Sequence, residues 1–373
     1  MYPIIIANLS LRINHLRLRE LEITGFRNLA RLKLDFEPRA TLFAFVGKNG
    51  QGKTNLLEAI FLCGLSKSFR TAKNQDLIGF EEDFCRVGVT LSEAEVKTLE
   101  VIITRVPADK VFKVNGVKHA ATEFVGHLPL VFFSPDDLSE LGLSPTLRRR
   151  YLNVMLGQLD RRYLETLLKY THALHQRNVL LRQIRDKKAK ERDLDVWDEA
   201  LAPLGMKLVT ERAVAVEALY PLVARFYKKL SGVSGDLAMG YQVSAEPERL
   251  AEKLAAARPR DVATGATSVG PHRDDLRFLW NGHDMQSFAS RGEWRSLVLA
   301  LKLAEKEWMR EKCGTDPILL LDDVFSELDD ERQKTLIENL GHSQVFLTTT
   351  HVEFLKDIQM PQVVHEIRGG EVL

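Results

Sequence analysis

The stretch Gly47-Lys48-Asn49-Gly50-Gln51-Gly52-Lys53-Thr54 fits the pattern G-x-x-x-x-G-K-[ST] at every specified position. A continuous apolar run over residues 41–46 precedes it, which is typical of a buried strand that feeds a loop. After Thr54, apolar residues recur at helical spacing from Leu56 to Leu65, so we expect a helix there. The alternative, a glycine-rich turn that contains Lys-Thr by chance, does not account for this context. The sequence therefore predicts a phosphate-binding loop.

Each position of this loop has a chemical reason. Glycines let successive backbone N–H groups turn inward, and the helix N-terminus adds partial positive charge. Lys53 is expected to neutralise the β- and γ-phosphate oxygens, and the Thr54 hydroxyl to ligate Mg²⁺. We therefore expect ATP and Mg²⁺ as cofactors. The predicted nucleotide contacts are Gly47, Lys48, Asn49, Gly50, Gln51, Gly52, Lys53, Thr54 and Asn55.

Two carboxylates follow a second apolar run. Ile318 to Leu321 predicts a buried strand, and Asp322 and Asp323 come directly after it. Ligands of open α/β sheets bind at the carboxyl ends of strands, so these acids are placed for catalysis beside the phosphate loop. We expect Asp322 to hold Mg²⁺ and Asp323 to polarise the attacking water as general base. The alternative is a structural strand followed by an Asp that caps a helix.

A further anion site is suggested by Ser290-Arg291-Gly292-Glu293, which precedes a predicted helix over residues 293–312. A serine hydroxyl and a glycine N–H at a helix N-terminus can bind phosphate. The same four residues also form an ordinary helix-capping sequence. Their place, about 28 residues before the acidic strand, is what favours the nucleotide role.

The order of predicted elements indicates an α/β fold with an insertion. Strand-like runs dominate the first part, residues 145–230 are strongly helical, and α/β character returns near residue 318. Asn115-Gly116 and Asn281-Gly282 each predict a hairpin turn. Pro203 and Pro221 are expected to mark helix starts or breaks. We expect a mixed-sheet lobe I from residues 1–133 and 310–373, and a mostly helical lobe II from residues 134–309.

Composition limits the partners. The chain has 373 residues with a formal net charge of +1, so any DNA contact must come from a local basic patch. The densest basic run supplies Arg182, Arg185, Lys188 and Arg192, which could share one helix face. Interspersed Asp186, Glu191 and Asp193 favour an ordinary solvated surface instead. Lys67, Arg70 and Lys73 are competing candidates.

The sequence gives no sign of a membrane or an oxidising compartment. It contains no apolar run near the roughly 18 residues that a membrane span needs. The start, Met1 to Ala7, lacks the basic segment of a signal peptide. Its three cysteines contain no CxxC pair, so neither a zinc site nor a disulfide framework is supported. We expect a cytoplasmic protein with no membrane partner.

Six strings along the chain are informative together. They are Gly25-Phe26-Arg27-Asn28, Ser66 to Thr71, Phe133 to Leu138, Arg148-Arg149-Arg150, Gly270-Pro271-His272-Arg273-Asp274-Asp275-Leu276, and Leu320 to Asp329. With these strings, almost the whole chain resembles the RecF family, within the ABC-type ATPases that include the SMC proteins. The string Gly270 to Leu276 is the most specific of them.

The resemblance implies an ABC-type ATPase head without a long coiled coil. It implies an ATP-driven homodimer that clamps duplex or gapped DNA, hydrolyses ATP slowly with stimulation by DNA, and acts with RecR and RecO to load RecA. It also implies that Ser290 and Gly292 contact the ATP of the second subunit, that Asp329 lies at the dimer seam, and that His351 senses the γ-phosphate. Arg291 stands where the family usually has Gln, and Met1 to Leu11 precede the usual start.

Three other functions fit a phosphate loop. An ATPase subunit of a transporter is disfavoured by the string Gly270 to Leu276 and by the arginine-rich helical insertion. An SMC-like structural clamp needs long heptad arms, which this sequence does not carry. A P-loop kinase needs an acceptor pocket and a lid that we do not find in the sequence.

Overall fold

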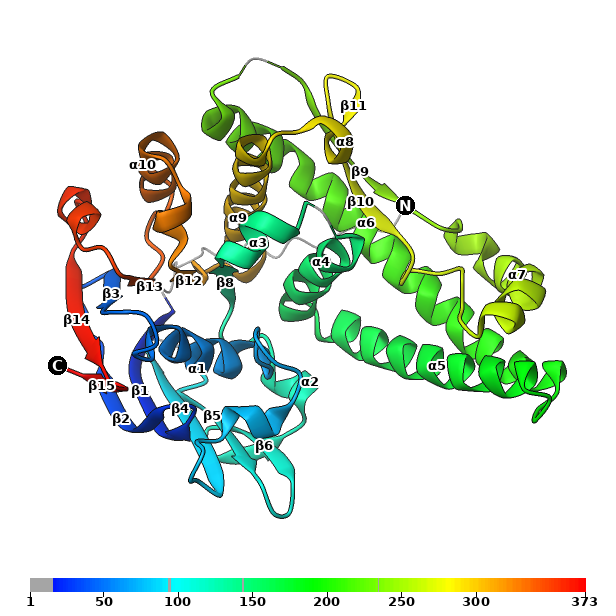
Figure 1. Ribbon diagram of the computed structural model, residues 1–373, viewed down its shortest axis with the longest axis horizontal. Helices are drawn as coiled ribbons and strands as arrows, with labels where there is room; N and C mark the ends of the chain where they lie inside the picture. Colours follow the sequence, from blue (N-terminus) through cyan, green and yellow to red (C-terminus); the bar gives the residue numbers. More distant parts are fainter. Residues whose placement is uncertain (1–15, 93–94, 143, 234) are drawn as a thin grey trace.

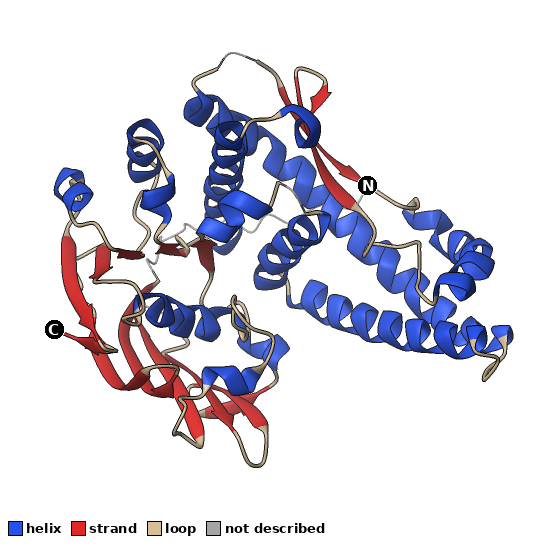
Figure 2. Ribbon diagram, in the orientation of Figure 1, coloured by secondary structure: helices blue, strands red, loops and turns tan. Residues whose placement is uncertain are grey.

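The computed structural model describes residues 16–92, 95–142, 144–233 and 235–373. The segment Met1 to Leu11 lies outside the described residues. Strands gather at one end of the molecule and long helices at the other (Figures 1 and 2). The predicted fold class, an α/β ATPase head with a mostly helical insertion, is confirmed. The division at residues 133/134 and 309/310 stays a prediction.

The phosphate loop lies at the carboxyl end of the central strand of a six-stranded sheet. The strand order is β15-β14-β3-β13-β12-β8, with all neighbours parallel except the β14–β15 pair. Helices and the second sheet cover both faces of its inner part, which explains why β3, β8 and residues 318–321 of β12 are continuous apolar runs. The strands are β3 (Leu42–Val46), β8 (Leu130–Phe133), β12 (Ile318–Asp322), β13 (Val345–Thr349), β14 (Gln362–Arg368) and β15 (Glu371–Val372).

A second, antiparallel sheet packs beneath the first. Its strand order is β2-β1-β4-β5-β6-β7. Helix α1 (Lys53–Leu65) lies between the two sheets, and its side chains are buried around most of its circumference. The helix is therefore apolar on nearly every side. The strands are β1 (Arg17–Phe26), β2 (Leu29–Asp35), β4 (Phe84–Ser92), β5 (Thr98–Thr104), β6 (Asp109–Val114) and β7 (Val117–His119).

The long helices form the other end of the molecule. Helix α6 packs between α5 and α9, and the apolar side chains of all three share one core with the outer face of the P-loop sheet (Figure 1). The helices of this part of the molecule are α3 (Pro135–Glu140), α4 (Pro145–Leu159), α5 (Arg161–Arg185), α6 (Asp195–Ser231), α7 (Leu250–Thr264) and α9 (Arg291–Cys313).

Short elements complete the fold. A small sheet of order β11-β10-β9 crosses the helical part. Both predicted Asn-Gly turns are confirmed: they join β6 to β7 and β10 to β11, and each Asn has a positive φ of 49°. The short elements are η1 (Asn74–Leu77), α2 (Ala121–Phe124), η2 (Glu191–Leu194), β9 (Leu237–Gln242), η3 (Pro247–Arg249), β10 (Asp275–Trp280), β11 (His283–Asp284), α8 (Met285–Phe288), η4 (Val324–Glu327), α10 (Asp330–Glu338) and η5 (Glu353–Asp357).

The expectation for two prolines is wrong. Pro203 and Pro221 lie inside the unbroken helix α6 and mark neither a start nor a break. Buried side chains recur along the whole helix, from Leu201 to Leu230. This packing stabilises the helix by more than the lost backbone hydrogen bonds destabilise it.

Candidate nucleotide-binding site

The phosphate loop has the backbone form that its glycines allow. Gly52, at the N-cap of α1, has a φ of 109°, which strains any residue with a Cβ. A Cβ at Gly47 would lie 2.4 Å from the carbonyl oxygen of Ile367 on the neighbouring strand β14. The loop is therefore held close to the sheet, with the N-terminus of α1 opening toward the phosphate position.

Lys53 folds back over the loop. Its Nζ donates to the carbonyl oxygens of Gly47 at 2.6 Å and Lys48 at 2.9 Å, and only 7% of the residue is exposed. Burial lowers the pKa of Lys53, while the nearby charges of Asp323 and Asp322 oppose that shift. The ammonium group is thus positioned where phosphate oxygens would lie against the loop.

Asp322 accepts two hydroxyl hydrogen bonds on the same oxygen. Thr54 Oγ1 lies 2.9 Å and Thr348 Oγ1 lies 2.6 Å from Oδ1 of Asp322. Burial raises the pKa of Asp322, whereas both hydroxyl bonds favour the ionised form. Because strands β3, β13 and β12 are parallel neighbours, their carboxyl ends bring these three residues together. The two predicted Mg²⁺ ligands, Thr54 and Asp322, therefore lie within hydrogen-bond distance of each other, and their metal-binding role stays a prediction.

Asp323 is held in an uncommon conformation. Its φ is 47°, in the left-handed region that a residue with a Cβ rarely adopts. Its backbone N–H donates to Thr348 Oγ1 at 3.0 Å. Its Oδ1 is buried and has no hydrogen-bond partner. An unpaired buried carboxylate oxygen on a strained backbone is costly and is found mainly where a ligand or a reaction requires it.

A pocket of about 380 Å³ joins these groups. It brings together eight of the predicted residues. Three further lining residues, Asn28, Arg70 and Thr348, were not predicted as nucleotide contacts. The eight predicted residues that line it are Asn49, Gly50, Gly52, Lys53, Thr54, Asn55, Asp322 and Asp323.

Two of the additional residues, Asn28 and Arg70, are joined by hydrogen bonds through Asn55. Arg70 donates to Asn55 Oδ1 at 2.8 Å, and Asn55 donates to Asn28 Oδ1 at 2.7 Å. Strings around Asn28 and Arg70 carry the family resemblance, and the sequence contains no other signal that either residue contacts a nucleotide. Arg70, a candidate DNA contact from the sequence, lines the nucleotide pocket in the structure.

A buried carboxylate fixes the loop that presents Arg70. Glu58, on α1, has no exposed surface and pairs with Arg27 through two hydrogen bonds of 2.8 and 3.0 Å. Ser68 donates to the same carboxylate at 2.5 Å and accepts the N–H groups of Arg70 and Thr71. The strands, α1 and this loop are thereby tied together beneath the pocket.

Gln51 faces away from the pocket lining and holds the C-terminal hairpin. Its Oε1 accepts the N–H of Gly369 at 2.6 Å, and its carbonyl oxygen accepts the N–H of Gly370 at 2.9 Å. The structure therefore gives Gln51 a contact with β14–β15, and its predicted nucleotide contact remains a prediction.

Ser290 and Gly292, which are predicted to contact the ATP of a second subunit, lie outside the nucleotide pocket of their own chain. Ser290 caps α9, with its Oγ accepting from Glu293 N at 3.3 Å and Glu293 Oε2 accepting from Ser290 N at 2.7 Å. Ser290 is exposed, and neither it nor Gly292 lines the nucleotide pocket of the same chain. The structure thus shows the ordinary helix cap, and the contact of Ser290 and Gly292 with the ATP of a second subunit stays a prediction.

Arg332 connects Asp329, which is predicted to lie at the dimer seam, to the first turns of α9. It pairs with Asp329 through one guanidinium nitrogen, and its Nε donates to Ser296 Oγ at 2.9 Å. A third contact, 3.3 Å long, reaches the carbonyl oxygen of Gly292. Asp329 also caps α10. The loop with Asp329 and the start of α9 are therefore one connected unit.

His351 is exposed after β13 and does not line the pocket. Its N–H donates to Thr349 Oγ1 at 3.0 Å. Its predicted role as a γ-phosphate sensor stays a prediction.

The expectation of a shared helix face for the basic run is wrong. Helix α5 ends at Arg185, and Lys187 has a positive φ of 60°. Lys188 therefore lies in the turn, and Arg192 lies in the separate short helix η2. All four predicted side chains, of Arg182, Arg185, Lys188 and Arg192, are exposed at this end of the molecule.

The string Gly270 to Leu276 holds the helical part together. His272 Nδ1 accepts from the hydroxyl of Tyr170 on α5 at 2.8 Å, and its Nε2 donates to the carbonyl oxygen of Thr267 at 3.0 Å. Asp275 pairs with the fully buried Arg148 of α4, with two hydrogen bonds of 2.8 Å. The string Gly270 to Leu276 therefore lies in the helical part and contributes no residue to the nucleotide pocket.

The fold and the site define a class of protein. A phosphate loop on a parallel sheet, an acidic strand beside it, and an inserted helical part ending in a capped helix make an ATPase head of the ABC and SMC kind. A family model described as the RecF/RecN/SMC N-terminal domain matches residues 17–371.

Similar proteins identify the family within this class. The DNA replication and repair protein RecF of Moorella thermoacetica is 40% identical over 361 residues, covering 95% of this chain and 96% of that one. The RecF protein of Lachnoclostridium phytofermentans is 37% identical over 336 residues, covering 90% and 93%. A solved structure of RecF with ATP has a TM-score of 0.88 at 34% identity and covers 98% of this chain and 99% of that one. This chain belongs to the RecF family.

More distant structures share the fold. The SMC head domain of Pyrococcus furiosus has a TM-score of 0.55 at 17% identity. In the part of the chain that the structure describes, no helix is long and apolar enough to cross a membrane.

Proposed function

We propose that this chain is an ATP-dependent DNA-binding protein of recombinational repair. ATP drives it to form a homodimer that clamps duplex or gapped DNA, and hydrolysis is slow and stimulated by DNA. The observation that carries the ATPase proposal is the buried, unpaired oxygen of Asp323 in the same pocket as Lys53 and Asp322. Support for the DNA role comes from the relatives, which are DNA replication and repair proteins.

The residues present fit ATP with Mg²⁺. Mg²⁺ uses few protein ligands and takes the rest from phosphates and water, so a pocket with one well-placed carboxylate and one hydroxyl is suitable. Thr54 and Asp322 would hold the ion, with Thr54 keeping its hydrogen bond to Asp322. The ion would neutralise charge on the β- and γ-phosphates.

Several residues of this chain would each have a separate role in ATP hydrolysis. Lys53 and the loop N–H groups bind and orient the phosphates. Asp323 accepts a proton from the attacking water at its free Oδ1. Thr348 keeps Asp323 and Asp322 in fixed positions through its two hydrogen bonds. Arg70 lines the same pocket and can contact phosphate oxygens.

The dimer proposal rests on residues that have no nucleotide partner within one chain. Ser290 and Gly292 are placed at an exposed helix N-terminus, where they can bind the ATP held by residues Gly47 to Thr54 of a second copy. Two such sites would be related by a twofold axis. The contact of Arg332 with both Asp329 and Gly292 supports a single surface at the seam.

DNA and the repair partners complete the proposal. Arg182, Arg185, Lys188 and Arg192 would contact the phosphate backbone without reading bases. RecR is the proposed direct partner, with RecO and RecA downstream at single-strand gaps. We place this activity in the cytoplasm.

Binding of a gapped duplex at two salt concentrations tests the proposal. The wild type should bind the duplex more tightly with ATP and Mg²⁺, and its affinity should fall steeply with salt. Lys53→Met should remove the ATP effect and retain the fold. DNA affinity that is weak, independent of salt and indifferent to ATP would favour an ATPase subunit coupled to a partner other than DNA.

A further inference from the structure

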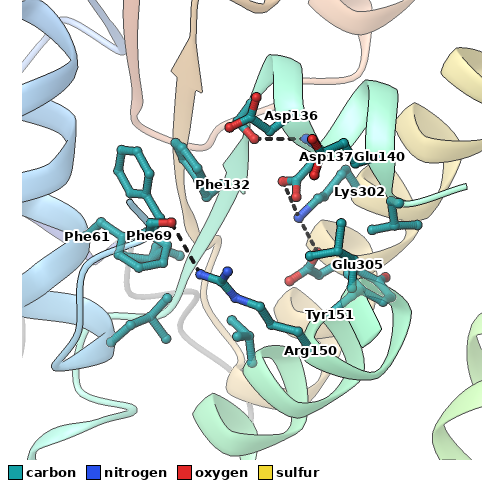
Figure 3. A pocket seen from close by; sticks show the side chains of 16 residues that line it. Phe61, Phe69, Phe132, Asp136, Asp137, Glu140, Arg150, Tyr151, Lys302 and Glu305 are labelled. Carbon is teal, nitrogen blue, oxygen red and sulfur yellow. Dashed lines mark hydrogen bonds and ion pairs between the residues drawn. The ribbon is translucent and has the colours of Figure 1, made fainter. Parts of the chain in front are cut away.

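A second cavity lies between the P-loop sheet and the helical part of the chain (Figure 3). Its volume is about 160 Å³. One wall comes from α1, the loop after it and β8, and the opposite wall comes from α3, α4 and α9. None of its lining residues lines the nucleotide pocket, so an occupant of this cavity can be distinguished from a nucleotide.

Three phenylalanine rings form the apolar wall. Phe69 and Phe132 stack with ring centroids 4.2 Å apart and an interplanar angle of 30°. Phe61 meets both rings edge-on, at 5.1 and 5.3 Å. A flat apolar group can lie against such rings, and a cation is attracted to their faces.

The opposite wall is polar and carries more carboxyls than cations (Figure 3). Lys302 Nζ lies 3.3 Å from Asp137 Oδ2 and 3.8 Å from Glu305 Oε2, and it sits 5.3 Å from the centroid of the Tyr151 ring. Arg150 donates to the carbonyl oxygen of Phe69 at 3.4 Å. The charged side chains of this wall are Asp136, Asp137, Glu140, Arg150, Lys302 and Glu305.

Glu305 presents an unsatisfied acceptor to the cavity. The residue is 2% exposed, and its Oε2 has no hydrogen-bond partner, since Lys302 is too distant. Burial raises the pKa of Glu305 to about 7. A buried acceptor without a donor is costly, so a ligand that donates a hydrogen bond here would be stabilised.

The chemistry of the walls selects the class of ligand. An anion would be repelled by the carboxyls. Among the described residues, no group of three or more His, Cys, Asp or Glu side chains is placed to hold a metal ion. The walls are complementary to an organic cation with hydrogen-bond donors at one end and a flat apolar body at the other, because carboxyls outnumber cations and Oε2 of Glu305 lacks a donor.

We propose that this cavity binds a small aryl cation, such as an aryl amidine or aryl guanidine. Its charged end donates to Oε2 of Glu305, and its ring lies against Phe69 and Phe132. The occupant touches both the P-loop end and the helical end of the molecule, because the walls come from both.

Benzamidine is the probe that tests this site, with benzamide as its neutral isostere. Titration of the full chain by calorimetry at pH 8 should show saturable binding of benzamidine and at least tenfold weaker binding of benzamide. Glu305→Gln should weaken benzamidine binding at least tenfold. Glu311→Gln, at an exposed position of the same helix, should leave it unchanged.

Lowering the pH gives an independent readout. Between pH 8 and pH 6 benzamidine affinity should fall about tenfold, because Glu305 becomes protonated across this range. The titratable and charged groups that line the cavity with Glu305 are Lys302 on its own helix, Asp136, Asp137 and Glu140 on α3, and Arg150 and Tyr151 on α4. In Glu305→Gln this pH dependence should be absent.

Phe69→Leu tests the apolar wall without touching the buried carboxylate. Phe69 is half-buried at the rim of the cavity, so the variant should fold and bind benzamidine more weakly. The proposal is overturned if the wild type shows no saturable binding, if benzamide binds as tightly as benzamidine, or if Glu305→Gln and Phe69→Leu both bind like the wild type.

Discussion

Thr348 Oγ1 donates a hydrogen bond of 2.6 Å to Oδ1 of Asp322 and accepts one of 3.0 Å from the backbone N–H of Asp323. One side chain on the neighbouring strand therefore orients both acids of the site. Thr348→Val keeps the shape and removes both hydrogen bonds. It should lower the free energy of unfolding by about 1–3 kcal/mol and slow hydrolysis, with ATP binding retained. Denaturant titration and phosphate release measure the two effects, and Thr210→Val, exposed on α6, is the matched control.

Asp323→Asn removes the proposed general base while keeping the size of the side chain. ATP binding should persist, and the single-turnover rate of hydrolysis should drop about a hundredfold or more. Asp330→Asn, exposed at the start of α10, should hydrolyse ATP like the wild type. A normal rate in Asp323→Asn would assign the base to another group. Asp323→Glu, which extends the carboxylate by one methylene, should raise the rate.

Some of this site could be predicted because it depends on local sequence. The phosphate loop and the acids after β12 lie at strand ends, where parallel strands bring distant residues together. Arg70 and Asn28 were missed as nucleotide contacts because their approach depends on the buried Glu58 network, which no spacing rule reveals. The left-handed backbone conformation of Asp323 likewise could not be predicted from the sequence.

Helix ends were predicted less well for a physical reason. The continuous helix α6 contains Pro203 because packing against α5 and α9 outweighs its local cost. The basic run looked helical from residue spacing, yet α5 ends at Arg185, where the chain turns through Lys187. Local composition could not show either outcome, because tertiary packing decides both.

His272 should make stability depend on pH. Burial lowers its pKa to about 4, and the bonds with Tyr170 and Thr267 fix the neutral ring. The unfolded chain takes up this proton near pH 6.5, so the stabilisation is complete above that pH and is lost as pH falls toward 4. His272→Gln should therefore be less stable than the wild type at pH 7.5, with a smaller difference at pH 5. Thermal melts check this, with exposed His175→Gln as control.

Arg332 should matter for association more than for folding. Lysine retains the charge but cannot make the three contacts with Asp329, Ser296 and Gly292. Arg332→Lys should melt within a few degrees of the wild type and weaken ATP-dependent dimerisation about tenfold. Arg310→Lys, exposed on α9, is the control. Unchanged dimerisation would show that the contacts of Arg332 with Asp329, Ser296 and Gly292 do not contribute to the dimer seam.

The basic end of α5 can be tested by the salt dependence of DNA binding. Arg182→Ala with Arg185→Ala should weaken binding of duplexes of any sequence and reduce the slope of log affinity against log salt by about 2. Arg249→Ala, at an exposed arginine paired with Glu252, should leave the slope unchanged. An unchanged slope in the double variant would move the DNA contact elsewhere, with Lys67 and Lys73 as the next residues to replace.

Sedimentation of the wild type and Ser290→Arg, with and without ATP and Mg²⁺ and with and without a gapped duplex, tests the composite site most directly. We expect the wild type to be a monomer that becomes a DNA-bound dimer only with ATP. Ser290→Arg should bind ATP normally and stay monomeric, since the added side chain blocks the exposed cap of α9. If Ser290→Arg dimerises with ATP as the wild type does, or if the wild type ignores ATP, the shared nucleotide site is contradicted.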